Sequence, residues 1–321
     1  MNPIADQTAD QVSHLGERAL IKAITDWLGD CNPSSPRGIG DDAAIISVPQ
    51  EKAVITKDAL VFKKHFDETT SPYQAGAKLL KRNISDIAAM GGKPTHAVVA
   101  CLIPPTISLK WIQAFYEGLR DCANDFSILI VGGDVASTFE DIAFTLTLVG
   151  EPGTRTLERK TGNPSDTIWV TGSLGGSILG KHLNFNPRIP EGSWLSNFPS
   201  ATSAMDISDG LATDLIHLCP DDCRAEVNTD CLPLSSASFE LEKSSGKTAI
   251  EHALTDGEDY ELLFTIAHSV SPNSFIKQWQ EFSDLPVTQI GKLIESEDPT
   301  QSKIRYIGSG IGGESEGYEH F

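Results

Sequence analysis

The sequence predicts an α/β protein of two domains, and three features of the 321-residue chain support that prediction. Short runs rich in β-branched residues alternate with longer segments that carry apolar residues at helical spacing. The length suits about two domains of roughly 150 residues each. A composition with 40% hydrophobic and 21% charged residues is typical of a globular chain and not of a disordered one or a coiled coil.

The first alternation of strands and helices extends to residue 150. The expected helices are 18–28, 73–90 and 109–124, and the expected strands are 43–48, 53–56, 97–102, 127–131 and 142–149. The segment Glu151-Pro152-Gly153 then interrupts the pattern, and a new strand at 167–171 starts a second alternation. The predicted domains are therefore residues 1–150 and 151–321.

Two segments of the second half lack periodicity. Residues 184–200 are rich in Asn, Pro and Trp, so we expect a long loop there. Residues 308–317 form a glycine-rich tail that is expected to fold back without becoming a helix or strand.

The excess of acidic residues restricts the partners of this chain. The 44 Asp and Glu residues outnumber the 25 Lys and Arg residues, which gives a net charge of −19 and a pI near 4.7. Such a surface does not bind nucleic acid or an anionic membrane by counterion release. No apolar stretch approaches the roughly 20 residues that cross a bilayer, and residues 1–12 lack the basic start of a secretory signal. We therefore expect a cytoplasmic protein without a membrane span.

Six cysteines are too few for a disulfide framework, and a reducing cytoplasm keeps them as thiols. One group has a spacing that zinc ligands could use, namely His217, Cys219, Cys223 and Cys231. The paired C-x-x-C knuckles of most structural zinc sites are absent from it. Ordinary cysteines near a helix end are the favoured interpretation.

Two glycine-rich segments imitate nucleotide-binding loops. Residues 175–182 read GGSILGKH and nearly match the P-loop, but His182 replaces the hydroxyl residue that would coordinate magnesium. We interpret this segment as a turn that packs a helix onto a sheet. Residues 308–313 fit G-x-G-x-x-G, but only eight residues follow, too few for the helix and strand of a dinucleotide-binding unit.

Acidic residues beside glycines are the strongest chemical signal in the first half. They are expected at the ends of strands, where α/β proteins build ligand sites. Asp42 belongs to GIGDD (38–42) before a strand, Asp58 ends the strand at 53–56, and Asp134 belongs to GGD (132–134) after the strand at 127–131. These positions make all three candidate ligand-binding residues.

Three further acids extend the pattern. Asp206 and Asp209 belong to DISDG (206–210), just before the helical run 211–219, and Asp206 or Ser208 capping that helix is the simpler alternative. Asp86 falls in the helix 73–90, three residues after Asn83, so these two polar groups share one face. Convergence of all six aspartates would require cations, because like charges repel. All-oxygen ligands suit magnesium, so the residues predict a magnesium-dependent phosphoryl-transfer site without a P-loop.

Seven motifs resemble those of the thiamine-monophosphate kinases, a family of the aminoimidazole-ribonucleotide-synthetase-like (AIR-synthetase-like) superfamily. NISDIAAMG and GEDYELLF in this order are specific enough to make chance agreement improbable. The matching motifs are GE (16–17), GIGDD (38–42), NISDIAAMG (83–91), GGD (132–134), DISDG (206–210), DGEDYELLF (256–264) and GYEHF (317–321).

The resemblance implies an ATP-dependent transfer of the γ-phosphoryl group to thiamine monophosphate, in a homodimer. It implies an N-terminal α/β domain that binds ATP and magnesium and whose strands form a barrel across the dimer, followed by a three-layer α/β domain. The implied magnesium ligands are Asp42, Thr56, Asp58, Asp86, Asp134, Asp206 and Asp209, with Asp42, Asp86 and Asp209 as the catalytic group; the implied ATP contacts are Gly133, Asp134, Arg159 and Ser208; the implied substrate contacts are His65, Glu258 and Tyr318.

The implied roles agree with the chemistry of these residues. Arg159 can bind two phosphate oxygens at once, and the Tyr318 ring can face a cationic thiazolium. The acceptor phosphate has a second pKa near 6 and is mostly deprotonated at neutral pH, so neither a general base nor a covalent nucleophile is required. Without the resemblance, His65 would be a packing or surface residue, Tyr318 a docked anchor, and Glu258 part of a turn.

The chain departs from the family pattern at three places. Lys57 stands between Thr56 and Asp58, where the family usually has a hydroxyl residue; it either faces away from the ligands or, facing inward, displaces a magnesium ion or binds phosphate. Val135 and Ala136 follow GGD in place of hydroxyl residues, and the basic segment at 181–188 is altered.

Two other functions stay open from the sequence alone. Another enzyme of the superfamily is one, although the chain lacks the reactive N-terminal Cys or Lys of selenophosphate synthetases and the terminal Cys of carbamoyl-dehydrating maturation factors. A relative that binds nucleotide or thiamine phosphate without turnover is the other, and Lys57 with the altered segments motivates it.

Overall fold

The chain forms two compact units in a computed structural model that describes residues 11–35, 37–39, 46–47, 51–296 and 302–308. Unit 1 comprises residues 1–87 and 93–151, and unit 2 comprises residues 88–92 and 152–321. The short segment 88–92, at and after the end of a helix of unit 1, thus packs with the second half of the chain. No helix in the described ranges is long and apolar enough to cross a membrane.

The described residues of unit 1 form a four-stranded sheet with strand order β1-β4-β2-β3. β4 pairs antiparallel with β1 and β2, whereas β3 pairs parallel with β2. The expected helices and the last four expected strands are confirmed, whereas the strand predicted at 43–48 lies almost wholly outside the described residues. The elements are α1 (Val12–Leu15), α2 (Glu17–Leu28), β1 (Val54–Val61), α3 (Pro72–Ala89), β2 (Lys93–Ile103), α4 (Leu109–Asp125), β3 (Leu129–Ser137) and β4 (Ala143–Glu151), with a 3-10 turn at Gly29–Cys31.

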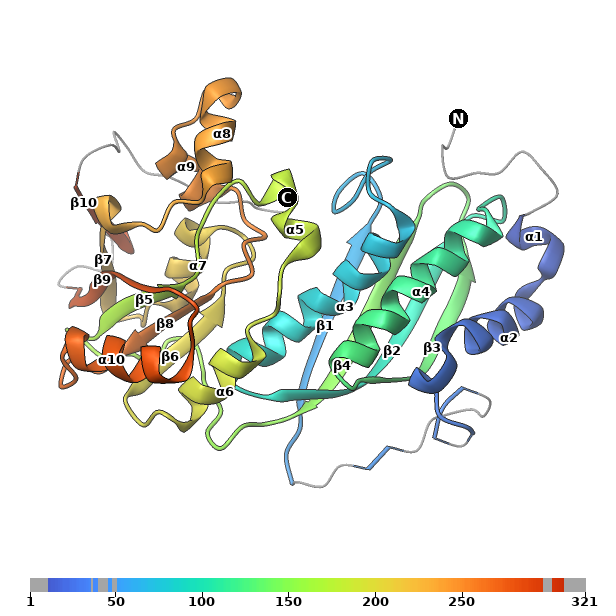
Figure 1. The fold of residues 1–321 in the computed structure, drawn as a ribbon, viewed down its shortest axis with the longest axis horizontal. Helices are drawn as coiled ribbons and strands as arrows, with labels where there is room; N and C mark the ends of the chain where they lie inside the picture. The colour runs from blue at the N-terminus through green and yellow to red at the C-terminus, as the bar shows by residue number, and fades with distance from the viewer. Residues whose placement is uncertain (1–10, 36, 40–45, 48–50, 297–301, 309–321) are drawn as a thin grey trace. The chain divides into compact units, whose positions relative to one another are not determined.

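Helices α3 and α4 cover one face of this sheet (Figure 1). α4 begins where the Ser108 side chain accepts a hydrogen bond from the Trp111 N–H. Along β4 every second residue is buried, and the ring of Phe144 stacks on that of Phe115 from α4 with 3.9 Å between centroids. The alternation gives β4 one apolar face for the helices, as expected for a strand covered on one side.

In unit 2, the part of the chain that the structure describes contains a six-stranded sheet with strand order β10-β7-β9-β5-β8-β6. β5 (Thr167–Thr171), the first strand in sequence, pairs antiparallel with both β8 and β9. The remaining elements are α5 (Lys181–Asn184), α6 (Ile189–Asn197), β6 (Ala201–Asp206), α7 (Leu211–Leu218), β7 (Cys223–Asn228), α8 (Ser236–Ser245), α9 (Ala249–Thr255), β8 (Leu262–Ile266), α10 (Pro272–Phe282), β9 (Val287–Glu295) and β10 (Ile304–Ile307), with 3-10 turns at Ser177–Leu179 and Thr229–Cys231.

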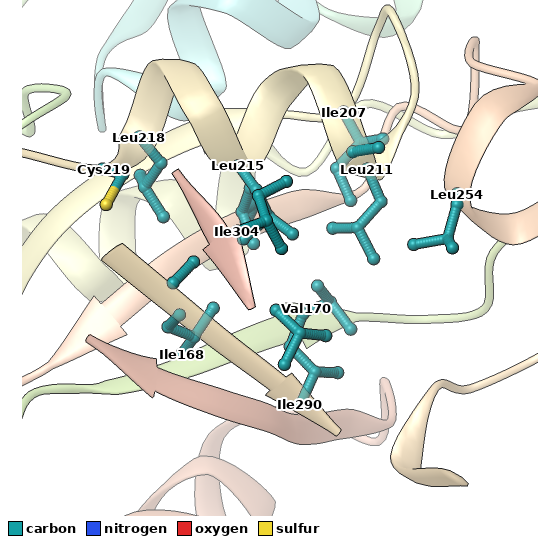
Figure 2. Packing of buried hydrophobic residues seen from close by; sticks show 14 of the residues in the cluster. Ile168, Val170, Ile207, Leu211, Leu215, Leu218, Cys219, Leu254, Ile290 and Ile304 are labelled. Atoms are coloured by element: carbon teal, nitrogen blue, oxygen red, sulfur yellow. The ribbon is translucent and has the colours of Figure 1, made fainter. Parts of the chain in front are cut away.

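Helix α7 packs its apolar side against this sheet. Leu211, Leu215 and Leu218 lie at helical spacing and are all buried. Figure 2 shows them facing Ile168 and Val170 of β5, with Ile290 beside them. The D-I-S-D-G segment that precedes α7 is therefore attached to a rigid helix and, on its other side, to β6.

The loop predicted over 184–200 is wrong, because α6 (Ile189–Asn197) occupies its centre. Leu195 is fully buried, and the Trp194 ring stacks on Phe198 at 4.9 Å and meets Phe275 of α10 edge-on. The segment has little helical periodicity of its own. Contacts with aromatic residues about 80 positions later in the chain stabilise it, and sequence spacing within the segment does not reveal them.

Candidate functional site

Thr56, Asp58 and Asp86 come together where β1 packs against α3. The Thr56 hydroxyl donates to Asp86 Oδ2 at 2.5 Å. Asp58 Oδ1 lies 3.6 Å from a guanidinium nitrogen of Arg82, which also donates to the Ala59 carbonyl. Asp58 was expected to end a strand, and that is wrong: β1 continues to Val61. The three oxygen-bearing side chains therefore extend from the middle of a strand and from a helix.

Lys57 lies on the opposite face of β1 from these residues. Thr56, Asp58 and Leu60 are half-buried or buried, whereas Ile55, Lys57 and Ala59 are exposed. Successive side chains of a strand point to opposite faces. Of the two alternatives for Lys57, the structure has the one in which it faces away from Thr56 and Asp58.

Gly133 and Asp134 lie inside β3, not at the end of a strand as predicted. The close approach of β2 explains why a glycine stands at position 133: a Cβ there would lie 2.1 Å from the carbonyl oxygen of Val99. In the register of the sheet, Asp134 lies opposite Ala100, and Ala100 lies opposite Thr145. These side chains are on the same face of the sheet as Lys57. Asp134 is thus on the other face and the other edge strand from Thr56 and Asp58, and unit 1 does not bring it to them. A cavity of about 100 Å³ beside Gly133 and Asp134 is lined mainly by apolar side chains of α2 and β3.

The D-I-S-D-G segment connects β6 to α7. Asp206 ends β6 and is buried, whereas Ser208 and Asp209 are half-buried. Helix capping by Asp206 or Ser208 is wrong, because Gly210 occupies the N-cap and makes no side-chain hydrogen bond. The segment is held instead by Asp214 Oδ2, which accepts the N–H groups of Ser208 and Asp209 at 2.9 and 3.1 Å.

Asp214 is surrounded by negative charge. Its carboxyl is 1% exposed. Burial, followed by the charges of Asp206 and Asp209, raises its pKa to about 8. Three carboxylates this close favour a nearby cation.

The D-G-E-D-Y segment at 256–260 lies directly against D-I-S-D-G. The Glu258 N–H donates to the Ser208 carbonyl at 2.7 Å, and the Tyr260 N–H donates to the Ile207 carbonyl at 2.9 Å. Glu258 and Tyr260 both have positive φ, 53° and 50°, which non-glycine residues rarely adopt. The Tyr260 hydroxyl donates to Glu258 Oε1 at 3.1 Å, and its ring stacks on Phe185 at 3.9 Å. Glu258 is therefore fixed beside Ser208.

The P-loop-like segment at 175–182 is a turn, as predicted, and its amides bind the carboxylates of the protein itself. The Gly175 N–H donates to Asp259, and the Gly176 N–H donates to Asp256 at 2.9 Å. The Ser177 hydroxyl donates to the Gly257 carbonyl at 2.6 Å. In a P-loop, backbone and hydroxyl donors of this kind would bind a phosphate. Here they bind residues of the 256–260 segment instead, so the turn anchors that segment.

The altered basic segment at 181–188 neutralises two buried acids. Arg188 forms a two-pronged contact with Glu261 at 2.8 and 2.7 Å, and Lys181 Nζ lies 2.9 Å from Glu261 and 3.7 Å from Asp259. Glu261 also accepts from the Thr171 hydroxyl at 2.7 Å. Burial raises the pKa of Asp259 to about 7, although Lys181 opposes this. We name these four charged residues, Lys181, Arg188, Asp259 and Glu261, the buried charge cluster.

The remaining predicted residues are placed separately. His65 lies in the turn after β1, where its ring accepts the Val61 N–H at 2.9 Å. Arg159 is exposed and, within the described part of the chain, has no hydrogen bond or ion pair. Asp42 and Tyr318 lie outside the described residues. Cys219 and Cys223 are free and buried, and burial raises the pKa of both thiols.

Sequence reasoning missed three residues that support the site. Asp214 and Glu261 are each a lone acid within an apolar run, LATDLIHL and YELLF, and Lys78 is a lone base in GAKLL. All three are at most 1% exposed. The available signal was a charged residue at a position where the hydrophobic periodicity of the helix or strand requires an apolar one. Such a charge is buried only when it has a partner.

Known proteins share this architecture over both units. Residues 40–151 match the family model described as AIR synthase related protein, N-terminal domain. The thiamine-monophosphate kinase of Rhodopirellula baltica is 34% identical over 275 residues, which cover 82% of this chain and 84% of the relative.

Two solved structures are similar as well. The crystal structure of thiamine-monophosphate kinase from Stenotrophomonas maltophilia K279a has a TM-score of 0.74 and 31% identity, and covers 91% of this chain and 96% of that one. The structure of AaThiL complexed with AMPPCP and TMP has a TM-score of 0.72 and 30% identity, and covers 98% and 100%. The chain therefore belongs to the thiamine-monophosphate kinase family and has its AIR-synthetase-like fold.

Proposed function

We propose that this protein transfers the γ-phosphoryl group of ATP directly to thiamine monophosphate in a magnesium-dependent reaction that yields thiamine diphosphate. The junction of D-I-S-D-G with D-G-E-D-Y carries the proposal, because the Glu258 N–H donates to the Ser208 carbonyl and so places these two residues side by side. In this proposal the first segment contacts metal and ATP and the second contacts the acceptor. Relatives named thiamine-monophosphate kinase, and one solved with AMPPCP and TMP, support the choice of substrates.

The oxygen donors of each unit suit magnesium. No three His, Cys, Asp or Glu side chains form a ready metal centre within the described ranges. Among the residues that the structure describes, the buried Asn83 Oδ1 on α3 has no hydrogen-bond partner. Asn83 lies one turn before Asp86, so this helix offers a further oxygen ligand on the face that carries Asp86. Hard oxygen donors of this kind fit magnesium better than zinc.

We propose that magnesium is held by side chains of β1, α3 and β3 within unit 1 and by side chains of D-I-S-D-G within unit 2. When bound, magnesium neutralises phosphate charge and aligns the two reacting phosphates. The proposed ligands are Asp42, Thr56, Asp58, Asp86, Asp134, Asp206 and Asp209, of which Asp42, Asp86 and Asp209 are proposed to be catalytic.

The other proposed residues bind the two substrates. Gly133, Asp134, Arg159 and Ser208 are assigned to ATP, and His65, Glu258 and Tyr318 to thiamine monophosphate. Arg159 is exposed and pairs with no other side chain in the described ranges, so its guanidinium is available to bind two phosphate oxygens. The acceptor phosphate is mostly deprotonated at neutral pH, so these residues align anions and exclude water without removing a proton.

Two broader assignments accompany the proposal. We assign ATP and magnesium binding to the N-terminal domain, residues 1–150, with residues 151–321 as the second domain of the same superfamily. We also place the reaction in the cytoplasm, since all six cysteines are free thiols and suit a reducing compartment.

The proposal is tested by incubating the protein with ATP and thiamine monophosphate and measuring thiamine diphosphate by chromatography. Product is expected with magnesium and none with excess EDTA. Thermal shifts with each ligand accompany the assay. Stabilisation by both ligands without product would refute catalysis and leave a silent binding protein, whereas no shift and no product would refute the choice of substrates.

Lys57→Thr is expected to leave the magnesium dependence of this activity unchanged, because Lys57 faces away from Thr56 and Asp58. Thr56→Val, in the same strand, removes the hydroxyl that contacts Asp86 and is expected to raise the magnesium concentration needed for half-maximal rate. Titration of magnesium at saturating substrates compares the two variants. A change in Lys57→Thr as large as that in Thr56→Val would contradict the assigned orientation.

We propose further that the protein is a homodimer and that the face of the unit 1 sheet away from α3 and α4 forms the interface. This face carries Ile55, 70% exposed, and Val98, 41% exposed; on β4 between them, Val149 pairs with Ile55 and Thr147 pairs with Val98. Val98→Glu is expected to convert the dimer to monomer because the interface would bury an unpaired charge. Sedimentation velocity measures the change, with exposed Phe139→Glu as the control; a dimeric Val98→Glu variant would exclude this face.

A further inference from the structure

Three polar side chains connect α8 and α9 with the segment at 256–260, and none of them is assigned to metal, ATP or substrate. His252 lies on α9 and is 4% exposed, and both of its ring nitrogens contact other side chains. Nδ1 lies 2.9 Å from each carboxylate oxygen of Asp256, and Nε2 lies 2.7 Å from the hydroxyl oxygen of Ser245. We name Ser245, His252 and Asp256 the histidine link.

The sequence brings these three residues together at the ends of two short helices. Ser245 is the last residue of α8. His252 and Asp256 are four residues apart, on α9 and at its C-cap, so their side chains share one face of the helix. The two helices lie side by side (Figure 1), and this places the His252 ring against the end of α8.

The carboxylate determines the direction of the hydrogen bond between His252 and Asp256. An ionised Asp256 can only accept, so Nδ1 of His252 must carry the hydrogen that lies between the two side chains. A hydrogen bond to an ionised acceptor is roughly twice as strong as one between neutral groups. Asp256 Oδ2 also accepts the Gly176 N–H at 2.9 Å. The Asp256 side chain is therefore held both from α9 and from the turn at 175–182.

Asp256 is the first residue of the segment that meets D-I-S-D-G. Two positions later, the Glu258 N–H donates to the Ser208 carbonyl at 2.7 Å. The last turn of α9 meets the same segment, because a Cβ at Gly210 would lie 2.8 Å from the Leu254 carbonyl oxygen. Glu258 has a φ of 53°, and such a conformation is retained only where the surrounding contacts fix the backbone. Holding Asp256 thus fixes the start of a strained segment that carries Glu258.

We propose that His252 is a positioning residue for phosphoryl transfer: through Asp256 it holds the D-G-E-D-Y segment, and with it Glu258, in place beside D-I-S-D-G. In this proposal Ser245 fixes the orientation of the His252 ring. The effect on substrate binding rests on the proposed function. The hydrogen bonds of the histidine link lie within unit 2, so the link and the reaction can fail separately.

Two substitutions of His252 test the positioning role. His252→Leu removes both ring nitrogens and still fills the buried site, whereas His252→Asn keeps an N–H near the position of Nδ1. Loss of one hydrogen bond to a charged group corresponds to about a tenfold change in affinity. We expect His252→Leu to raise KM for thiamine monophosphate by about that factor, and His252→Asn to restore most of the loss. KM for ATP is expected to stay constant, because Asp214 holds D-I-S-D-G independently.

The split between KM and kcat separates positioning from a role in folding alone. A variant that is merely less stable has a smaller active fraction, which lowers the apparent kcat at an unchanged KM. A wild-type KM for thiamine monophosphate in His252→Leu, with or without a lower kcat, would overturn the proposal.

A double-mutant cycle tests whether His252 acts through Asp256. Asp256→Ala is expected to raise KM for thiamine monophosphate at least as much as His252→Leu, and the double variant is expected to match Asp256→Ala. His268→Leu is the matched control, because the His268 side chain is 68% exposed, and it is expected to behave as wild type. Effects that multiply in the double variant, or an equal rise of KM in His268→Leu, would contradict the histidine link.

Hydrogen exchange tests the histidine link without any substrate. Mass spectrometry is expected to show faster exchange over residues 256–260 in His252→Leu and Asp256→Ala, with exchange over β5 unchanged. Unchanged exchange over 256–260, or equally faster exchange over β5, overturns the link. Faster exchange confined to 256–260, together with a wild-type protein that makes no thiamine diphosphate, supports the link and overturns the proposed function.

Discussion

Replacing Glu261 by alanine is expected to lower the free energy of unfolding by about 3–5 kcal/mol. Glu261 is 1% exposed and accepts from Arg188 and from the Thr171 hydroxyl, with Lys181 Nζ 2.9 Å away. Its removal leaves the largely buried Lys181 and Arg188 without the carboxylate that lies nearest to each of them. The loss of one member of a buried ionic group is costly because the partners keep their desolvation penalty.

Urea denaturation followed by fluorescence measures this change, with the midpoint and slope fitted separately. Glu261→Gln, which keeps the acceptor oxygen and the shape, is expected to lose less stability than Glu261→Ala. Glu240→Ala on α8 is the control, since Glu240 is exposed and its loss should change stability by less than about 0.5 kcal/mol. Equal midpoints for Glu261→Ala and Glu240→Ala would show that the buried charge cluster does not stabilise the fold.

Asp209→Asn is expected to reduce kcat/KM for thiamine diphosphate formation by on the order of a thousandfold, the scale of losing a charged group that stabilises a transition state. Asp209 is half-buried, and Asp214 fixes its N–H at 3.1 Å. The amide of Asn has the same size but no charge to hold magnesium. The backbone contact with Asp214 is retained, so the variant is expected to fold normally.

Steady-state kinetics with magnesium titration measures the effect. Asp221→Asn is the control, because Asp221 is exposed and its carboxylate forms an ion pair with Lys160 on the surface. Asp214→Ala is expected to lose about ten- to a hundredfold, as typical of residues that orient metal ligands. An Asp209→Asn enzyme with near wild-type kcat/KM would remove Asp209 from the catalytic group, whatever the result for Asp214.

The elements of both units were largely predictable because their apolar residues follow a simple period. β4 alternates strictly, and α7 carries Leu211, Leu215 and Leu218 at helical spacing. Where periodicity was weak the prediction failed. α6 is stabilised by aromatic contacts with α10. The strands β1 and β3 continue through polar residues, because α3 and α4 cover one face of the sheet and residues such as Lys57 and Asp134 lie on the other.

The motifs identified candidate site residues but not the side chains that fix these residues in place. D-I-S-D-G indicated Asp206 and Asp209, yet the carboxylate that fixes the segment belongs to Asp214, inside an otherwise apolar helix. Glu261 is paired with Arg188 and Lys181. Both of these residues come from a segment that the sequence presented only as a departure from the family. Such pairings depend on how distant segments meet, and one sequence gives spacing along the chain but not proximity in space.

The central position of β5 has a consequence for biosynthesis. β5 is made first among the strands of unit 2, but its two neighbours, β8 and β9, lie about 90 and 120 residues later in the sequence. At the usual rates of translation, roughly ten seconds separate its emergence from that of β9. During that interval Ile168, Trp169 and Val170, all buried in the finished sheet, are exposed on the nascent chain. Unit 2 therefore completes its fold only late in translation, and until then this apolar strand needs a chaperone or transient local contacts to avoid aggregation.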